Sequence, residues 1–429
     1  MKITVIGIGY VGLVTGVGLA ELGHTVYCVD TIKEKIDLLK KGQASFYEPD
    51  LEKLLKKNIN GKRLMFSHSL AEVINKTDFL FICVGTPPQA DGSADLSYIY
   101  SVADQIKKLA NRSKVIVVKS TVPVGSNVKI QNLLSKSKKA KFSVVSCPEF
   151  LREGRAIHDF FNPDRLVVGS DNQKSAKAVA DLFKKVKGQR VITKRETAEL
   201  IKYASNAFLA TKISFINEIS NLCDKVKADV SVVALGMGLD KRINPYFLQA
   251  GLGYGGSCFP KDVKALRQIS GGHGYDFKLL KAVIEVNTKQ RKIFMEKIER
   301  VLGDLAGKKI GLLGLAFKDN TDDIRESAAI DLAKYLVKAG ASVKAYDAKA
   351  ALNAKKVLGN KVVFASSAYE AVKSVDAAII ATEWPEFAKL DWTRVKKLMK
   401  QPIIFDGKNL LDPKKMKRIK FDYYSVGRA

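Results

Sequence analysis

One cysteine of this 429-residue chain lies in a segment whose residue types could do chemistry, GLGYGGSCFPKD at 251–262. Four glycines, Pro260 and the Lys261–Asp262 pair surround Cys258. Segments rich in Gly and Pro are usually loops, so the thiol is either structural filler or a nucleophile. A thiolate is both a good nucleophile and a good leaving group, as covalent catalysis requires. If Cys258 is a nucleophile, we expect the glycines to leave space that a substrate fills.

Two polar side chains interrupt the apolar stripe of a long helix, which we expect over residues 197–229. Lys202 and Asn206 are four residues apart and share a face with Leu209. The segment contains no Gly or Pro, and its length suits a domain connector or a dimer spine. Polar residues in an apolar stripe favour a functional site. A surface pair between Lys202 and Glu199 is the structural alternative.

Three glycines near the N-terminus have the spacing of a dinucleotide-binding turn. KITVIGIGYVG places Gly7, Gly9 and Gly12 between an apolar strand and an apolar helix, and TVYCVD ends at Asp30. In a βαβ unit these glycines permit the tight turn, the approach of a pyrophosphate and the packing of helix on strand. The helix N-terminus holds the pyrophosphate, and the aspartate accepts from the ribose hydroxyls while repelling a 2′-phosphate. The pattern therefore predicts NAD binding in preference to NADP.

Further apolar segments at 78–87, 114–125 and 142–150 predict strands that end in small, polar or Pro-rich residues. Ligands of open α/β sheets bind outside the carboxyl ends of strands. The candidates to line a cofactor and substrate cleft are therefore Thr86, Ser120, Thr121 and Glu149. An N-cap or turn role is the alternative for each of them.

A second strand and glycine turn, KKIGLLGLAFK at 308–318, precede a helix that ends near Gly340 and a strand that ends at Asp347. We expect a second α/β domain that binds another ligand. Lys318 follows its turn and Arg325 begins its helix, and both side chains suit phosphate.

Composition narrows the class of protein. Hydrophobic residues make up 46% and charged residues 27%, which is typical of a folded chain with two or three domains. No apolar run approaches the ~20 residues of a membrane span, so no membrane partner is expected. The net charge of +28 would allow nucleic-acid binding, but the densest basic run, SKSKKAK at 135–141, contains no aromatic residue. We therefore expect a solvated lysine-rich surface and no nucleic-acid partner.

The five cysteines are widely spaced, with no CxxC pair and no cluster with histidine: Cys28, Cys83, Cys147, Cys223 and Cys258. This pattern predicts neither a disulfide framework nor a metal site. A reduced, cytoplasmic protein fits it best.

Six motifs together resemble the UDP-glucose/GDP-mannose dehydrogenase family over essentially the whole chain: GYVG, KSTVPVG, PEFLREG, KYASNAFLATKISFINE, GYGGSCFPKD and LAFKDNTDDIRES. The resemblance implies an α/β fold with two Rossmann-like doubly wound domains, joined by a central helical domain with a long connecting helix. We expect an NAD domain at 1–196, a central dimerisation domain with the catalytic cysteine at 197–300, and a UDP-sugar domain at 301–429. A homodimer or higher homo-oligomer is implied.

The resemblance also implies a reaction, the NAD-dependent four-electron oxidation of UDP-glucose to UDP-glucuronate for polysaccharide or uronic acid biosynthesis. The aldehyde would be captured as a thiohemiacetal and oxidised to a thioester on Cys258. The further catalytic residues implied are Lys202 and Asn206 for the oxyanion, Asp262 for orienting water and lysine, Glu149 as general base and Thr121 for positioning water.

Ligand contacts follow from the same resemblance. Those implied for NAD are Gly7, Gly9, Tyr10, Val11, Gly12, Asp30, Lys35, Thr86, Thr121, Glu153 and Arg325. Those implied for the UDP-sugar are Glu149, Phe150, Leu151, Arg152, Lys202, Asn206, Arg242, Gln249, Gly253, Tyr254, Gly255 and Lys318. In some relatives the arginine matching Arg242 comes from the neighbouring subunit. At FDGKN this chain has Lys408 where the family commonly has arginine, so the charge is kept and the bidentate fork is lost.

Three other functions stay open. A dehydrogenase for GDP-mannose or a UDP-N-acetylhexosamine is the nearest, although GYGGSCFPKD favours UDP-glucose because the acetamido-sugar enzymes tend to carry GGHC variants. A two-electron dehydrogenase of the hydroxyacid type would not need the cysteine. A non-catalytic sensor of NAD and a sugar nucleotide would not need Cys258, Lys202, Asn206 and Asp262 together.

Overall fold

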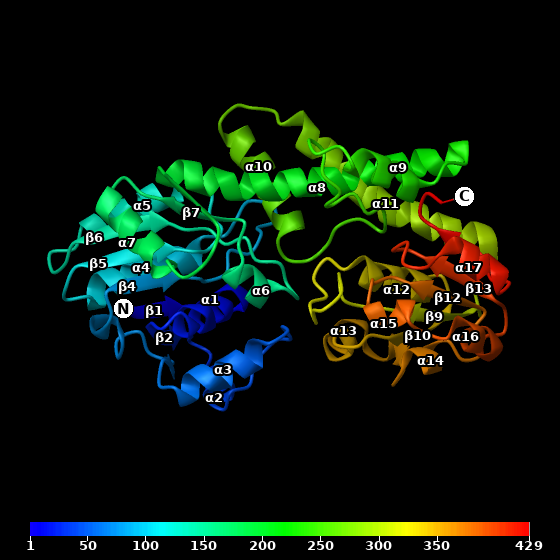
Figure 1. The fold of residues 1–429 in the computed structure, drawn as a ribbon, viewed down its shortest axis with the longest axis horizontal. Coiled ribbons are helices and arrows are strands. Elements are labelled where there is room, and N and C mark those ends of the chain that lie inside the picture. The colour runs from blue at the N-terminus through cyan, green and yellow to red at the C-terminus, as the bar shows by residue number, and fades with distance from the viewer. Residues whose placement is uncertain (429) are drawn as a thin grey trace. The chain divides into compact units, whose positions relative to one another are not determined.

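The computed structural model describes residues 1–428, and the chain divides into two compact units. The first unit comprises Met1–Ser205 and Gln268–Tyr275, and the second comprises Asn206–Arg267 and Asp276–Ala429. Each unit is built around one sheet, coloured blue to cyan in the first and yellow to red in the second (Figure 1).

The first unit contains an eight-stranded sheet in the order β3-β2-β1-β4-β5-β6-β7-β8. Its strands are β1 (Lys2–Ile6), β2 (Thr25–Val29), β3 (Leu64–Ser67), β4 (Phe79–Ile82), β5 (Lys114–Val118), β6 (Phe142–Ser146), β7 (Arg165–Gly169) and β8 (Gln189–Thr193). Neighbouring strands are parallel except β6 and β7, which pair antiparallel through Ser146 and Gly169. The order from β3 to β6 is that of a doubly wound dinucleotide-binding sheet.

Helices pack on both faces of this sheet because successive strand residues point to opposite sides. Ile3 and Val5 of β1 join one buried cluster with helix α1, whereas Ile6 joins a second cluster with α4. The helices are α1 (Tyr10–Glu21), α2 (Lys33–Lys40), α3 (Leu51–Asn60), α4 (Ser97–Leu109), α5 (Ser126–Ser135), α6 (Ala156–Phe161) and α7 (Gln173–Leu182), with a 3₁₀ turn at Ile74–Lys76.

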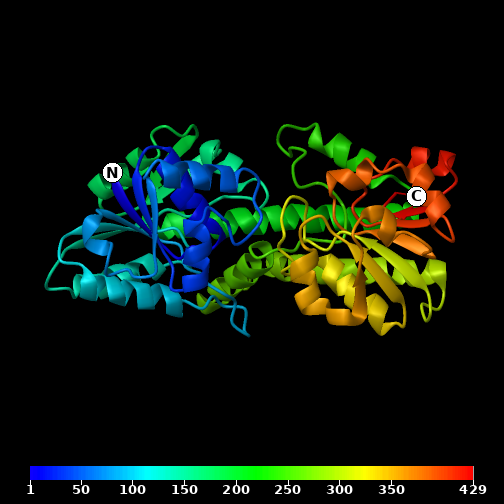
Figure 2. The same cartoon turned by 90° about the horizontal axis from the view of Figure 1, so that it is seen from below.

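The second unit contains a six-stranded parallel sheet in the order β11-β10-β9-β12-β13-β14. Its strands are coloured yellow to red in Figure 2. Its strands are β9 (Lys309–Leu313), β10 (Ser342–Tyr346), β11 (Val362–Phe364), β12 (Ala377–Ile380), β13 (Ile403–Asp406) and β14 (Asp422–Ser425). Its helices are α12 (Ala328–Lys338), α13 (Ala351–Leu358), α14 (Ala368–Ala371), α15 (Pro385–Ala388), α16 (Trp392–Leu398) and α17 (Pro413–Arg418), with a 3₁₀ turn at Gly359–Lys361. The order is again that of a doubly wound sheet. The prediction that Arg325 begins a helix is wrong, because Ser327 caps α12 and the helix starts at Ala328.

Four helices connect the two sheet segments in the sequence: α8 (Arg195–Val226), α9 (Val230–Gly238), α10 (Phe259–Gly272) and α11 (Lys278–Leu302). Helix α8 is 32 residues long, because its sequence contains no Gly or Pro to end it earlier. The predicted long helix and the predicted fold class are confirmed. Within residues 1–428, no helix has the length and apolar character needed to cross a membrane.

Candidate functional site

The glycine turn of the first unit has the geometry expected of a pyrophosphate cradle. Gly7 has φ +87°, and a Cβ at Gly12 would overlap the carbonyl oxygen of Gly7. A Cβ at Gly9 would meet no described atom within 4 Å, so this side of the turn is open. Helix α1 begins at the next residue, Tyr10, and its N-cap Gly9 supplies no side-chain cap. Open space at an uncapped helix N-terminus fits the pyrophosphate of NAD.

Asp30 lies at the end of β2 beside this turn. Its Oδ2 accepts from Ile8 N and from Lys35 Nζ, both at 2.8 Å, and its Oδ1 accepts from Ile32 N at 3.1 Å. Burial raises the pKa of Asp30, but the bonds from Lys35, Ile8 and Ile32 outweigh it and hold the pKa below its ordinary value. The carboxylate is therefore ionised and oriented, as acceptance from ribose hydroxyls requires, and the predicted pair Asp30 and Lys35 is brought together.

Two loops after neighbouring strands carry further predicted cofactor residues. Thr86 Oγ1 donates to the carbonyl oxygen of Thr121 at 3.0 Å, which joins the loops after β4 and β5. Both residues therefore lie at the carboxyl edge of the sheet, where ligands of such sheets bind.

Glu48 connects the glycine turn to the PEFLREG loop, and nothing in its sequence context predicted this. The Tyr10 hydroxyl donates to Glu48, and Gly154 N donates to Glu48 Oε2 at 2.7 Å and to the Tyr10 oxygen at 2.9 Å. Ala156 N donates to Glu48 Oε1 at 2.7 Å. Burial raises the pKa of both Glu48 and Tyr10. The predicted NAD residue Glu153 directly precedes Gly154 and is buried.

Glu149 and Lys202 form a buried ion pair in the first unit. Lys202 Nζ lies 2.9 Å from Glu149 Oε1, with 4% and 5% of the two side chains exposed. The Phe150 ring centroid lies 5.4 Å from Lys202 Nζ and 3.8 Å from the Arg165 guanidinium carbon. Burial raises the pKa of Glu149, but Lys202 and the Leu151 N–H outweigh it and lower the pKa below its ordinary value. Glu149 is therefore an ionised partner of Lys202.

Replacing Glu149 by Gln should change how stability responds to pH. The folded state holds the pKa of Glu149 below its ordinary value of 4.5, so the carboxylate stabilises the fold above pH 4.5. This contribution is lost as pH falls through the lower folded-state pKa. In thermal scans, we expect the Tm difference between the unmodified chain and Glu149→Gln to be largest near about pH 7 and to shrink between about pH 5 and about pH 3.

The exposed Asp37, replaced by Asn, is the matched control for the loss of one carboxylate. A Tm difference for Glu149→Gln that stays constant over the acidic range would contradict the assignment of the pair.

Glu199 and Lys202 are both buried, so the alternative of a surface pair is wrong. Glu199 Oε2 accepts from Gly125 N at 2.7 Å, and its Oε1 accepts from Asn127 N at 2.8 Å and Asn127 Nδ2 at 2.7 Å. Glu199 is 3% exposed, and burial raises its pKa. Helix α8 therefore caps α5 and fixes the end of the KSTVPVG loop that contains Thr121.

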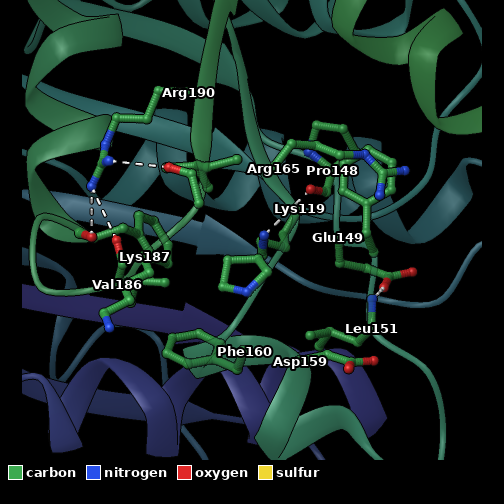
Figure 3. A pocket seen from close by; sticks show the side chains of 15 residues that line it. Lys119, Pro148, Glu149, Leu151, Asp159, Phe160, Arg165, Val186, Lys187 and Arg190 are labelled. Atoms are coloured by element: carbon green, nitrogen blue, oxygen red, sulfur yellow. Dashed lines mark hydrogen bonds between the residues drawn. The ribbon is translucent and has the colours of Figure 1, made fainter.

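A small pocket lies beside Glu149 and holds about 50 Å³ (Figure 3). Figure 3 shows Lys119, Glu149 and Arg165 around it, and Lys119 Nζ donates to the carbonyl oxygen of Cys147 at 3.2 Å. This volume is enough for a few water molecules.

Cys258 of the second unit lies directly before helix α10. Its carbonyl oxygen accepts from Asp262 N at 2.8 Å, so the thiol is at the helix N-terminus, where negative charge is favoured. Cys258 is partly exposed. Burial raises the pKa of each of the four other thiols, which belong to Cys28, Cys83, Cys147 and Cys223. The pKa of Cys83 is raised to about 12. Of the five cysteines, Cys258 has the surroundings that suit a reactive thiolate.

Two predicted catalytic residues meet in the second unit. Asn206 Nδ2 donates to Asp262 Oδ2 at 2.6 Å, and Lys261 Nζ lies 2.6 Å from Asp262 Oδ1. Asp262 is 1% exposed and Asn206 is 6% exposed. The carboxylate of Asp262 is thus held by two donors.

Protein atoms fill the space beside the glycines of the Cys258 loop. A Cβ at Gly253 would overlap Asn287 Oδ1, and a Cβ at Gly255 would overlap the carbonyl oxygen of Glu326. The expectation that a substrate occupies this space is therefore wrong at both positions. The two glycines instead let the loop pack against neighbouring segments of the same unit.

Two lysines follow strands of the second sheet, at the edge where a nucleotide is expected. Lys408 Nζ lies 2.8 Å from Glu383 Oε2 after β13, and Lys318 Nζ donates to the Asp319 carbonyl oxygen at 2.7 Å after β9. Burial raises the pKa of Glu383, but Lys408 and then Lys318 outweigh it and lower the pKa. The two cations therefore share one electrostatic neighbourhood, which suits a diphosphate.

The predicted binding arginines each pair with an aspartate. Arg152 Nε donates to Asp159 Oδ2 at 2.8 Å, Arg325 Nε to Asp323 Oδ2 at 2.8 Å and Arg242 Nη2 to Asp240 Oδ2 at 2.6 Å. Arg242 and Gln249 are exposed. An anionic ligand at any of these arginines competes with the aspartate. Within residues 1–428, no group of three or more His, Cys, Asp or Glu side chains could hold a metal ion.

Three family models match the chain in succession. They describe the NAD binding domain, the central domain and the UDP binding domain of the UDP-glucose/GDP-mannose dehydrogenase family, at residues 1–187, 196–289 and 311–413. UDP-glucose 6-dehydrogenase TuaD of Bacillus subtilis is 48% identical over 100% of this chain and 93% of its own length. UDP-glucose 6-dehydrogenase of Rickettsia conorii is 46% identical over 100% of this chain and 99% of its own length.

Solved structures agree with this similarity. A UDP-glucose dehydrogenase from the archaeon Pyrobaculum islandicum superposes with a TM-score of 0.93 at 40% identity, covering 100% of this chain and 98% of that one. A UDP-D-ManNAc dehydrogenase from Pyrococcus horikoshii has a TM-score of 0.87 at 27% identity, covering 100% and 99%.

Proposed function

Because the chain belongs to the UDP-glucose/GDP-mannose dehydrogenase family, we propose that it oxidises the C6 alcohol of UDP-glucose to the carboxylate of UDP-glucuronate. Relatives with that named activity share 48% and 46% of their residues with it, against 27% for the acetamido-sugar enzyme. This difference supports UDP-glucose over a UDP-N-acetylhexosamine. Two NAD molecules, bound in turn at the glycine turn, would each accept one hydride.

The three domains predicted from the sequence are proposed to have separate roles. Residues 1–196 bind NAD, residues 197–300 dimerise and carry the nucleophile, and residues 301–429 bind the UDP group. The family models for the NAD binding domain and the central domain cover residues 1–187 and 196–289, close to the first two proposed domains. The model for the UDP binding domain, at 311–413, lies inside the third.

Cys258 is proposed to retain the intermediate between the two oxidations. Loss of the first hydride and a proton gives the aldehyde, to which the thiolate adds to form a thiohemiacetal. Loss of a second hydride and of the hydroxyl proton gives a thioester, and hydrolysis by water then releases the carboxylate, the thiol and a proton. The observation that carries this proposal is the placement of Cys258, partly exposed at the N-terminus of α10 while the four other thiols are buried.

The polar residues on helix α8 are proposed to stabilise negative charge at C6. Lys202, held by Glu149, and Asn206, held by Asp262, are four residues apart on this helix. An ammonium and an amide N–H at fixed positions stabilise a developing oxyanion. Glu149 is ionised and can accept a proton, but its lowered pKa makes it a weak base. Thr121 is proposed to position water.

Initial rates with a panel of nucleotide sugars test the substrate assignment. With NAD and purified protein, we expect UDP-glucose to give a kcat/KM at least ~10²-fold above GDP-mannose and UDP-N-acetylglucosamine, because a site shaped for one sugar discriminates strongly against unpaired polar groups. A higher kcat/KM for either alternative would overturn the assignment.

A homodimer is proposed from the exposed apolar side chains of the second unit. Phe208, Phe215 and Leu222 recur every seven residues on α8, with 65%, 49% and 54% exposed. A seven-residue repeat places them on one helix face, as in a helix that packs against a second helix. Leu235 of α9 and Leu239, which directly follows this helix, are 61% and 76% exposed. The partner proposed is a second copy of this chain. The five cysteines form no disulfide within the described residues, which supports a cytoplasmic location.

Replacing Phe215 by Lys should weaken the dimer about 30-fold or more, because a buried aromatic anchor contributes ~2 kcal/mol or more to an interface. Sedimentation velocity over a concentration series measures the change. Leu352→Lys on α13, whose side chain is 78% exposed, is the matched control and should leave the dimer intact. A monomeric unmodified chain, or an unaffected Phe215→Lys dimer, would contradict the proposal.

A further inference from the structure

The segment before Cys258 has a buried backbone without regular secondary structure. Gly251, Leu252, Tyr254 and Gly256 are buried, and no helix or strand includes them in the described chain. Buried backbone N–H and C=O groups need hydrogen-bond partners, and this segment cannot obtain them from its own ladder or helix. Its conformation therefore depends on side chains outside it.

Side-chain amides of α8 and α11 supply these partners. Asn287 Oδ1 accepts from Tyr254 N at 2.7 Å, and Asn287 Nδ2 donates to Tyr254 O at 3.1 Å. Asn217 Oδ1 accepts from Gly251 N at 2.9 Å, and Gln290 Nε2 donates to Gly251 O at 3.1 Å. The N–H and C=O of Tyr254 thus both bond to the Asn287 side chain, and Arg291 Nη2 also donates to the Tyr254 carbonyl oxygen at 3.1 Å.

Asn287 and the adjacent glycine fit each other. Gly253 has φ +92°, a conformation that other residues rarely adopt, and a Cβ there would overlap Asn287 Oδ1. Asn287 is 8% exposed, so water competes little for the hydrogen bonds of its side-chain amide. The absence of a side chain at Gly253 therefore leaves room for the Asn287 amide.

We propose that Asn287 is a positioning residue for the reaction: its paired hydrogen bonds to Tyr254 fix the loop that leads to Cys258. Tyr254 precedes Cys258 by four residues, and Gly256 N donates to the Arg325 carbonyl oxygen at 2.9 Å between them. Asn287 thus sets where the backbone enters the N-terminus of α10. The proposal rests on the function proposed for Cys258.

Two variants separate the two hydrogen bonds. Asn287→Asp keeps the size and the acceptor but replaces the donor to Tyr254 O by a repelling carboxylate oxygen. Asn287→Leu removes both bonds. We expect kcat per folded protein to fall ~10- to 100-fold in both, with KM within about three-fold, because a small misplacement of a reacting group costs up to ~10²-fold. Thr288→Val, on the exposed neighbouring position of α11, is the matched control and should leave kcat unchanged.

Hydrogen exchange followed by mass spectrometry provides a readout besides activity. We expect amide exchange to rise at least ~10-fold in the peptide over residues 250–257 and to stay unchanged over β9 to β12. If the loop exchanges faster while kcat is unchanged, the positioning role is wrong although the tether exists. If both variants lose activity only in proportion to the unfolded fraction, it is also wrong. Full activity of Cys258→Ser would instead refute the nucleophile, whatever the exchange shows.

Discussion

Replacing Cys258 by Ser should lower kcat for the complete oxidation of UDP-glucose at least ~10³-fold, because loss of a covalent nucleophile removes most of the rate enhancement. A serine hydroxyl is a poorer nucleophile than a thiolate, and its alkoxide is a poorer leaving group. The aldehyde should therefore be neither captured nor carried to the acid. NADH absorbance and trapping of the aldehyde with a hydrazine reagent measure the arrest.

Cys223→Ser is the matched control for this experiment. Cys223 is buried, and burial raises the pKa of its thiol, so this cysteine has no proposed catalytic role. We expect the activity of the Cys223→Ser variant to stay close to that of the unmodified chain. Complete oxidation by Cys258→Ser at an undiminished rate would show that another group captures the aldehyde.

Lys202→Met should have the second largest effect. It leaves the Glu149 carboxylate buried without the ammonium that lies 2.9 Å away, which costs ~3–5 kcal/mol of the free energy of unfolding. It also removes a proposed oxyanion donor, which lowers kcat by ~10²- to 10³-fold. Urea unfolding and steady-state kinetics on the folded fraction measure the two losses separately.

The double variant Lys202→Met/Glu149→Gln distinguishes the two roles of Lys202. Removing both charges should restore much of the stability, because no uncompensated carboxylate stays buried, but it should not restore kcat. Lys225→Met, an exposed lysine on the same helix, controls for the substitution itself. A double variant that regains activity together with stability would confine Lys202 to a structural role.

The sequence patterns with local geometry predicted most of the fold. The glycine turn, the strand that ends at Asp30 and the second glycine turn each lie within one βαβ unit, where residue spacing determines contact. The sequence also predicted that Lys202 and Asn206 lie on one face of a helix, because positions four apart share a helix face. Motifs along the whole chain also predicted the family correctly.

Contacts with distant backbone groups could not be predicted in this way. Glu48, Glu199 and Asn287 all bond to main-chain N–H groups, and Glu199 reaches one that is 74 positions away. Every residue except proline carries such a group, so no pairing of side-chain types marks the partner. Glycine is ambiguous for a similar reason, because the same residue permits a ligand or another part of the chain to approach. At Gly9 the space is open, and at Gly253 it holds Asn287.

The number of NADH molecules formed per UDP-glucose tests the central claim most directly. With NAD in excess and UDP-glucose limiting, the reaction is followed to completion by absorbance and the sugar product is identified by mass spectrometry. Capture of the aldehyde on Cys258 predicts two NADH per UDP-glucose, with UDP-glucuronate as the product and no free aldehyde. A yield of one NADH, with the aldehyde released, would contradict the thioester route.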